Sequence, residues 1–118
     1  PLRSVALTTD SSVLTCISND FGFESVFSRQ VEALLGPRDV LVALSTSGES
    51  GNVLGALRAA KKNGASTVAM LGKGGGAAAE IAEHVLIVGS DETARIQEAH
   101  ILIGHILCEI IERELGLD

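Results

Sequence analysis

DVLVALSTSGESGN, residues 39–52, joins a continuous apolar run to a loop of hydroxyl side chains. An apolar run without alternation is typical of a strand buried on both faces of a parallel sheet, so we expect a strand over Asp39–Leu44. Apolar residues at helical spacing then predict a helix over Asn52–Asn63, with Gly64 just past its end. The stretch therefore encodes a strand, a loop and a helix, the repeating unit of parallel sheets.

The same alternation continues on both sides of this unit. It predicts an α/β fold, a three-layer αβα sandwich with a parallel, flavodoxin-like or Rossmann-like sheet, in which ligands bind at the carboxyl ends of the strands. A chain of 118 residues has room for one such domain. The other expected elements are strands at Val5–Thr8, Ser66–Leu71 and His84–Val88, and helices at Ser11–Ser18, Phe23–Leu35, a short one ending at Ala82, and Glu92–Leu115.

Charge and composition exclude several classes of partner. The formal net charge is −6 and there is no Lys/Arg cluster, so we expect neither nucleic-acid binding nor attachment to an anionic membrane. No apolar run reaches the ~18 residues that a membrane span requires. Cys16 and Cys108 lack metal-site or redox spacing, which favours two reduced, buried thiols and a cytoplasmic location.

The loop at residues 45–50, STSGES, has the composition of an anion site. The free N–H groups at the start of the following helix attract a negative charge, and four hydroxyls can donate to it: Ser45, Thr46, Ser47 and Ser50. Without a lysine or a GK[ST] ending, the loop suits a monophosphate better than a nucleotide. The alternative is an ordinary hydroxyl-rich turn in which Ser50 caps the helix.

Three histidines are candidates for acid–base chemistry. His84 opens a predicted strand at the end away from the ligand edge, which indicates a structural role. His100 and His105 lie on the last helix and could transfer protons near neutral pH, although a lone histidine on an amphipathic helix is more often a core or interface residue. The glycine run at 72–76 lacks dinucleotide-binding spacing and is interpreted as a turn.

Several segments together resemble one known family. STSGES and the GNVL that follows resemble the phosphate-binding signature of sugar isomerase (SIS) domains. ISNDFGF at 17–23, ARIQEAH at 94–100 and GHIL at 104–107 narrow the resemblance to the phosphoheptose isomerase branch. The likeness runs from Val5 to the C-terminus and implies an SIS fold over residues 1–118, without the N-terminal helices and first strand of that family.

The resemblance implies an activity and a set of site residues. The activity is the conversion of sedoheptulose 7-phosphate to D-glycero-D-manno-heptose 7-phosphate, a precursor of the lipopolysaccharide core. Asn19 and Asp20 would contact the sugar, the four hydroxyls of residues 45–50 would hold the phosphate, and Gln97 and His105 would face the reacting end, with His105 catalytic. Gln97 and His105 would also ligate a zinc ion.

In that family, the remaining zinc ligands and the catalytic glutamate come from an upstream segment. Residues 1–118 alone are therefore expected to be inactive. The alternative is a non-catalytic SIS module that binds a sugar phosphate as a regulator, or a relative of the replication-initiator-associating proteins, which share the RIQE-type helix. The last helix is apolar around much of its girth, which indicates self-association, and the resemblance implies a homotetramer.

Overall fold

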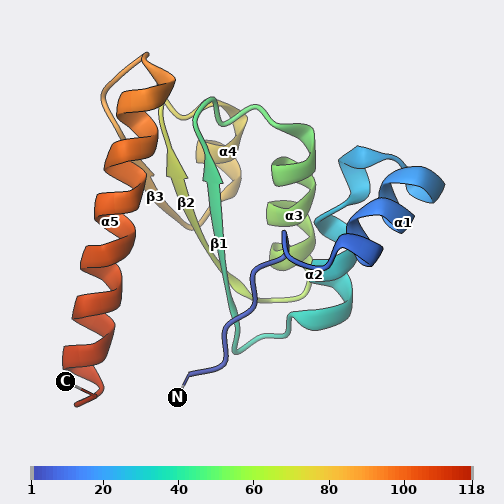
Figure 1. The fold of residues 1–118 in the computed structure, drawn as a ribbon, viewed down its shortest axis with the longest axis horizontal. Coiled ribbons are helices and arrows are strands. Elements are labelled where there is room, and N and C mark those ends of the chain that lie inside the picture. Colours follow the sequence, from blue (N-terminus) through green and yellow to red (C-terminus); the bar gives the residue numbers. More distant parts are fainter. Residues whose placement is uncertain (1, 118) are drawn as a thin grey trace.

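Three parallel strands form the centre of the molecule (Figure 1). The computed structural model describes residues 2–117. Along the chain the elements are α1 (Ser11–Phe21), the 3₁₀ turn η1 (Phe23–Ser25), α2 (Ser28–Leu34), β1 (Val40–Ser45), α3 (Gly51–Lys62), β2 (Ser66–Leu71), α4 (Gly76–Ile81), β3 (His84–Ile87) and α5 (Thr93–Glu114).

The strands pair in the order β1-β2-β3, and both pairs are parallel. Ser45 is in register with Leu71, and Leu71 with Ile87, so the three strands end together at one edge of the sheet. The loops after β1, β2 and β3 therefore meet at this edge, as expected for an α/β fold.

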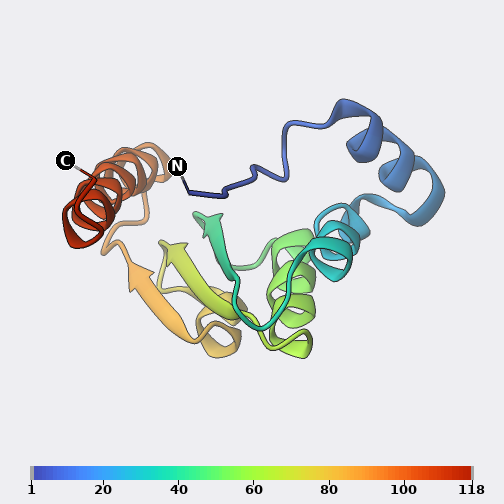
Figure 2. The same ribbon diagram turned by 90° about the horizontal axis from the view of Figure 1, so that it is seen from below.

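Helices cover both faces of the sheet, which confirms the predicted layered α/β architecture (Figure 2). The crossover helices α3 and α4 lie on one face, and α5 lies on the other. Between the sheet and α3 the core is aliphatic, with Leu57, Leu71 and Ala60 fully buried. On its far side α3 packs against α2, whose Val31 is also fully buried.

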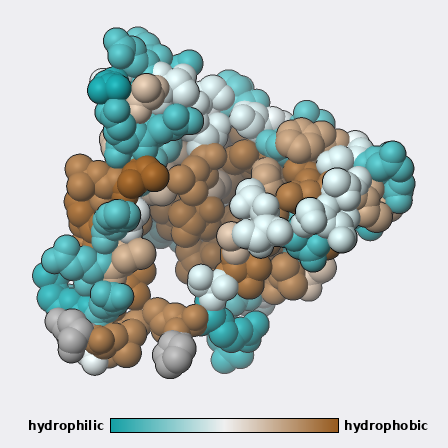
Figure 3. All heavy atoms as spheres, in the orientation of Figure 1, coloured by the Kyte–Doolittle hydropathy of each residue, from teal (hydrophilic) through white to brown (hydrophobic). Residues whose placement is uncertain are grey.

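The second face of β1 is open, contrary to the expectation of a strand buried on both sides. Burial alternates along β1, and Val40, Val42 and Leu44 are 57%, 49% and 54% exposed. Helix α5 lies toward the β3 edge of the sheet, so it leaves these three β1 side chains uncovered. In Figure 3, hydrophobic atoms gather in the middle of this side of the molecule, beside α5.

The prediction of a strand at Val5–Thr8 is wrong. Leu7 and Thr8 lie in a turn, and the described sheet ends at β1. The carbonyls of this segment are bonded to side chains: Thr9 Oγ1 donates to Ala6 O at 2.9 Å, and Gln30 Nε2 donates to Leu7 O at 3.0 Å. A β-branched run without a neighbouring strand has no ladder to join, so local hydrogen bonds determine its path.

The helices after this segment also differ from the expected boundaries. Helix α1 begins where expected, with the Asp10 side chain accepting from Val13 N, but it continues past Ser18 as far as Phe21. Gly22, at φ +85°, ends it. The single helix expected over Phe23–Leu35 is divided into η1 and α2, because the first residues form the tighter 3₁₀ hydrogen bonds.

Both cysteines are free, as expected, but they are exposed rather than buried. Cys16 lies on α1 and Cys108 on α5, on helix sides that no other described element covers. Among residues 2–117, no helix combines the length and the hydropathy needed to cross a bilayer.

Candidate functional site

The loop after β1 is folded around two of its own hydroxyls. Ser45, at the end of β1, is buried, and its Oγ accepts a hydrogen bond from Gly48 N at 3.0 Å. Ser47 Oγ accepts from Glu49 N at 3.2 Å. Gly48 has φ +69°, a conformation that glycine adopts without strain. These bonds turn the chain sharply from the strand into α3.

The glycine-rich turn after β2 and the start of α4 together hold this loop in place. Ala78 N donates to Gly48 O at 3.0 Å, and Ala77 N donates to Glu49 Oε1 at 2.8 Å. The two backbones approach so closely that a Cβ on Gly48 would collide with Gly75 O. Residues 72–75 of the glycine run therefore form a turn, as predicted, while Gly76 begins α4, and the turn and the helix support the loop together.

The start of α3 presents unpaired donors beside this loop. The first backbone bond that closes the helix is Leu54 N to Ser50 O at 2.9 Å, and Gly51 N and Asn52 N have no hydrogen-bond partner among the described residues. Ser50 occupies the N-cap position, yet its side chain makes no capping bond. Its Oγ lies 3.5 Å from Ser45 Oγ instead. The capping alternative therefore does not explain Ser50.

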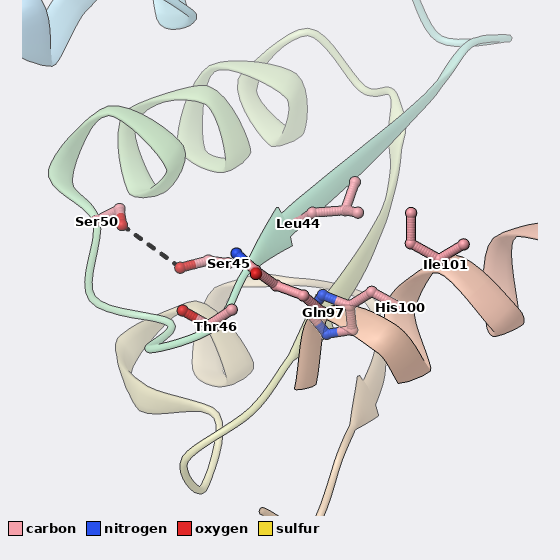
Figure 4. Close-up of a pocket in the computed structure, with 7 residues that line it drawn as sticks. All are labelled: Leu44, Ser45, Thr46, Ser50, Gln97, His100 and Ile101. Atoms are coloured by element: carbon pink, nitrogen blue, oxygen red, sulfur yellow. Dashed lines mark hydrogen bonds between the residues drawn. The ribbon is translucent and has the colours of Figure 1, made fainter. Parts of the chain in front are cut away.

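A cavity of about 550 Å³ opens between this loop and α5 (Figure 4). Its volume is within the roughly 300–1,000 Å³ of small-molecule pockets. The loop contributes hydroxyls to one side of it, and the first two turns of α5 form the other. The lining residues are Leu44, Ser45, Thr46, Ser50, Gln97, His100 and Ile101. The structure thus brings together four of the residues singled out in the sequence: Ser45, Thr46, Ser50 and Gln97.

His100 also lines the cavity, although sequence reasoning did not favour it over the other histidines. The residue is 4% exposed, and its Nε2 lies 3.2 Å from Leu71 O at the end of β2. It stands three residues after Gln97, on the same side of α5. This spacing puts His100 on the Gln97 side of α5, but it does not show that this side is buried against the sheet, so it could not by itself select His100.

Other candidate residues lie outside this cavity. Asn19 and Asp20 are on the exposed surface of α1, where Asn19 Nδ2 donates to Asp20 Oδ1 at 2.7 Å. His105 is exposed on α5, and Ser47 bonds within its loop. The sugar contacts of Asn19 and Asp20 and the catalytic role of His105 stay predictions.

The described residues do not make a zinc site by themselves. Gln97 lines the cavity, whereas His105 lies eight residues further along α5, a rise of ~12 Å. Within residues 2–117, no group of three His, Cys, Asp or Glu side chains is placed to hold a metal ion. Since zinc commonly takes four ligands, Gln97 and His105 would need further ligands from outside this set.

Curated relatives share this sequence over nearly its whole length. A phosphoheptose isomerase of Aquifex aeolicus is 54% identical over 112 residues, which cover 95% of this chain and 59% of the relative. Phosphoheptose isomerase 1 of Campylobacter jejuni is 57% identical over 111 residues, covering 94% of this chain and 60% of the relative. The chain therefore spans about three fifths of the length of these relatives.

Solved structures agree with the fold. A phosphoheptose isomerase from Neisseria gonorrhoeae has a TM-score of 0.89 at 49% identity, covering 91% of this chain and 61% of that one. Another, from Francisella tularensis, has a TM-score of 0.93 at 40% identity, covering 96% and 61%. The family model of the SIS domain matches residues 1–72, which include β1, the hydroxyl loop and β2. The chain belongs to the SIS domain family.

Proposed function

We propose that the protein containing this chain is an aldose–ketose isomerase that converts sedoheptulose 7-phosphate to D-glycero-D-manno-heptose 7-phosphate. The observation that carries the proposal is the pairing, across one cavity, of the hydroxyl loop with Gln97 on α5. The named activity of relatives that are 54% and 57% identical supports the same substrate. The product would enter heptose metabolism as a lipopolysaccharide core precursor.

The phosphate is proposed to bind at the α3 end of the cavity. Gly51 N and Asn52 N have no partner among the described residues and can donate to its oxygens, and the helix dipole favours the negative charge there. The Ser50 hydroxyl makes no capping bond, and it can donate to the phosphate when Ser45 Oγ donates to it. An overall charge of −6 does not prevent this, because the donors act at hydrogen-bond distance. Binding the far end of the substrate in this way directs its carbonyl end toward α5.

The proposed reaction moves one proton between two neighbouring carbons. A base removes a proton from C1 of the ketose, an enediol forms, and a proton returned to C2 completes the aldose while the oxygens exchange a proton. Gln97 is placed to hold a substrate oxygen at the α5 side of the cavity. His105 stays the predicted acid–base residue. The carbon base is expected from outside residues 1–118, which is why we expect these residues alone to be inactive.

The test compares two ligands and two readouts on the intact protein. Calorimetric titration should show sedoheptulose 7-phosphate binding at least a hundredfold more tightly than sedoheptulose, because only the former reaches the α3 donors. Turnover to the aldose, followed by NMR, then separates the isomerase from the non-catalytic SIS alternative. Equal affinity for the two ligands would contradict the proposed phosphate site. Binding without turnover would favour the non-catalytic SIS module.

Zinc at Gln97 and His105 remains part of this proposal, with its other ligands supplied from beyond the described residues. It is supported by the position of Gln97 in the cavity, and no step above depends on it. Metal analysis of the purified protein, with Gln97→Ala and His105→Ala as comparisons, checks it. A full complement of zinc in both variants would contradict the assignment.

Partners and location follow from the same chemistry. We propose self-association, as a homotetramer, because α5 exposes several large apolar side chains, including Ile101 at 65% and Leu102 at 61%. A cytoplasmic location is proposed because sugar phosphates are intracellular metabolites and because Cys16 and Cys108 are unpaired. The acidic charge gives no reason to expect nucleic acid or an anionic membrane as a partner.

A further inference from the structure

The reaction proposed above leaves one buried titratable group without a role. His100 is 4% exposed, yet it lines the cavity between the hydroxyl loop and α5. A core histidine far from any ligand would have its two ring nitrogens satisfied by the protein. The hydrogen bonds of His100 show a different arrangement.

One ring nitrogen is fixed by the backbone. Nε2 lies 3.2 Å from Leu71 O, and a carbonyl oxygen can only accept. Nε2 therefore carries the proton and donates it to Leu71 O. In the neutral imidazole the second nitrogen, Nδ1, is then an acceptor with a free lone pair. Since Leu71 is the last residue of β2, this bond also sets the orientation of the ring relative to the sheet edge.

The second nitrogen faces space that a ligand can fill. The one hydrogen bond that the structure gives this side chain uses Nε2, and among the described residues no fully buried side-chain nitrogen or oxygen lacks a partner. Nδ1 therefore retains contact with solvent. Because His100 is otherwise buried, and its open side is part of the cavity lining, that contact is in the cavity. Figure 4 shows the ring beside Gln97, opposite Ser45 and Thr46.

We propose that His100 binds a substrate hydroxyl, with Nδ1 accepting a hydrogen bond from the carbon chain of the sugar phosphate. This inference rests on the proposed function. The phosphate donors and His100 lie on different sides of the cavity. The loop therefore binds the charged phosphate, and His100 binds a hydroxyl group of the sugar chain. Together with Gln97, His100 distinguishes a phosphorylated sugar from phosphate alone.

Two amide substitutions separate this role from a structural one. The amide nitrogen of glutamine can take the place of Nε2, so His100→Gln keeps the donor to Leu71 O. Its acceptor oxygen lies one bond further from the backbone than Nδ1, so the position of Nδ1 in the cavity is left without an acceptor. Asparagine reaches only as far as Nδ1, so His100→Asn keeps a polar atom at the cavity and loses the bond to Leu71 O. His84→Gln is the matched control, because His84 is exposed on β3 and does not line the cavity.

The measurements are titrations of the intact protein with sedoheptulose 7-phosphate and with inorganic phosphate, and the midpoint of thermal unfolding. For His100→Gln we expect an unchanged midpoint, unchanged phosphate binding and about tenfold weaker binding of the sugar phosphate, the size of one lost hydrogen bond. His100→Asn should lower the midpoint and keep more of the preference for the sugar phosphate. The control should match the wild type throughout.

The outcomes distinguish the two proposals. If the wild type binds the sugar phosphate more tightly than phosphate and His100→Gln behaves in the same way, His100 has no role in recognition. If the sugar phosphate affinity falls only in the variant with a lower midpoint, the role is structural and the inference is overturned. If the wild type binds neither ligand, it is the proposed function that fails.

Discussion

The hydroxyls of residues 45–50 differ in what they are free to do. Ser45 and Ser47 each accept a backbone N–H inside the loop, so their oxygens hold the turn together. Ser50 makes no capping bond, and its hydroxyl lines the cavity. A phosphate should therefore depend more on Ser50 than on Ser47, although both belong to the same short sequence.

Alanine substitutions test this division. Ser50→Ala should weaken the binding of sedoheptulose 7-phosphate about tenfold, because one donor to a charged ligand is lost, and should leave sedoheptulose binding unchanged. Ser47→Ala is the matched control in the same loop and should cost at most about threefold. Titration calorimetry of both variants with both ligands measures the difference. Equal losses would show that the loop acts through its overall shape.

For single residues, the sequence predicts those parts of the site that depend on a short stretch of the chain. The hydroxyl loop could be predicted because it follows a strand that ends at the ligand-binding edge of a parallel sheet, whereas Gln97 was expected from the family resemblance, and the cavity brings the two together. His100 could not be chosen over His105 in this way. Its burial and its bond to Leu71 O depend on how α5 packs on the sheet, which no local pattern records.

At the scale of elements, the anion site belongs to the N-terminus of α3, and a carboxylate lies beside it. The Glu24 carboxylate fills the place where a Cβ on Gly51 would lie. Glu24 belongs to η1, which packs against α3. A negative side chain at a helix N-terminus stabilises the helix, and it also repels a second anion that approaches the same N–H groups.

Removing this charge should strengthen phosphate binding. Glu24→Gln keeps the shape of the side chain, and we expect the affinity for inorganic phosphate to rise about threefold at low salt, consistent with a helix-terminus charge effect of about 0.3–1 kcal/mol. The gain should shrink as salt is added, because the carboxylate is exposed. Glu32→Gln, on α2, is the control. An unchanged affinity at low salt would place the phosphate away from α3.

The elements that sequence reasoning missed share one physical cause. Helix and strand periodicity located β1, β2, β3 and the helices between them, because each has an apolar pattern of its own within a short stretch of chain. Val5–Thr8 has a strand-like composition, but a strand also needs a partner, and local bonds from Thr9 and Gln30 prevail there. The end of α1 at Gly22 depends on a backbone conformation, φ +85°, rather than on hydropathy.

For the whole molecule, the outstanding feature is apolar surface on the side that carries α5 (Figure 3). We define the α5 surface as its exposed large apolar residues: Ile101, Leu102, Ile106, Ile110 and Ile111. Each is between 39% and 65% exposed. An apolar surface along most of a long helix is unusual for a monomer, and its burial would supply ~25 cal/mol per Å². Ile101 also lines the cavity, so an assembly along α5 would border the site.

Charges on the α5 surface should break the assembly without unfolding the helix. Ile106→Glu combined with Ile110→Glu replaces two exposed apolar residues one turn apart, and glutamate is a good helix former. We expect light scattering after gel filtration to give a tetramer for the wild type and a smaller species for this variant, with far-UV circular dichroism unchanged. Glu112→Lys, exposed on the same helix, is the control and should stay tetrameric.

Because Ile101 adjoins both the cavity and this surface, dissociation should also weaken sugar phosphate binding. A wild type that is monomeric at micromolar concentration would refute self-association through α5. The proposed sugar phosphate site in the cavity would not depend on that result.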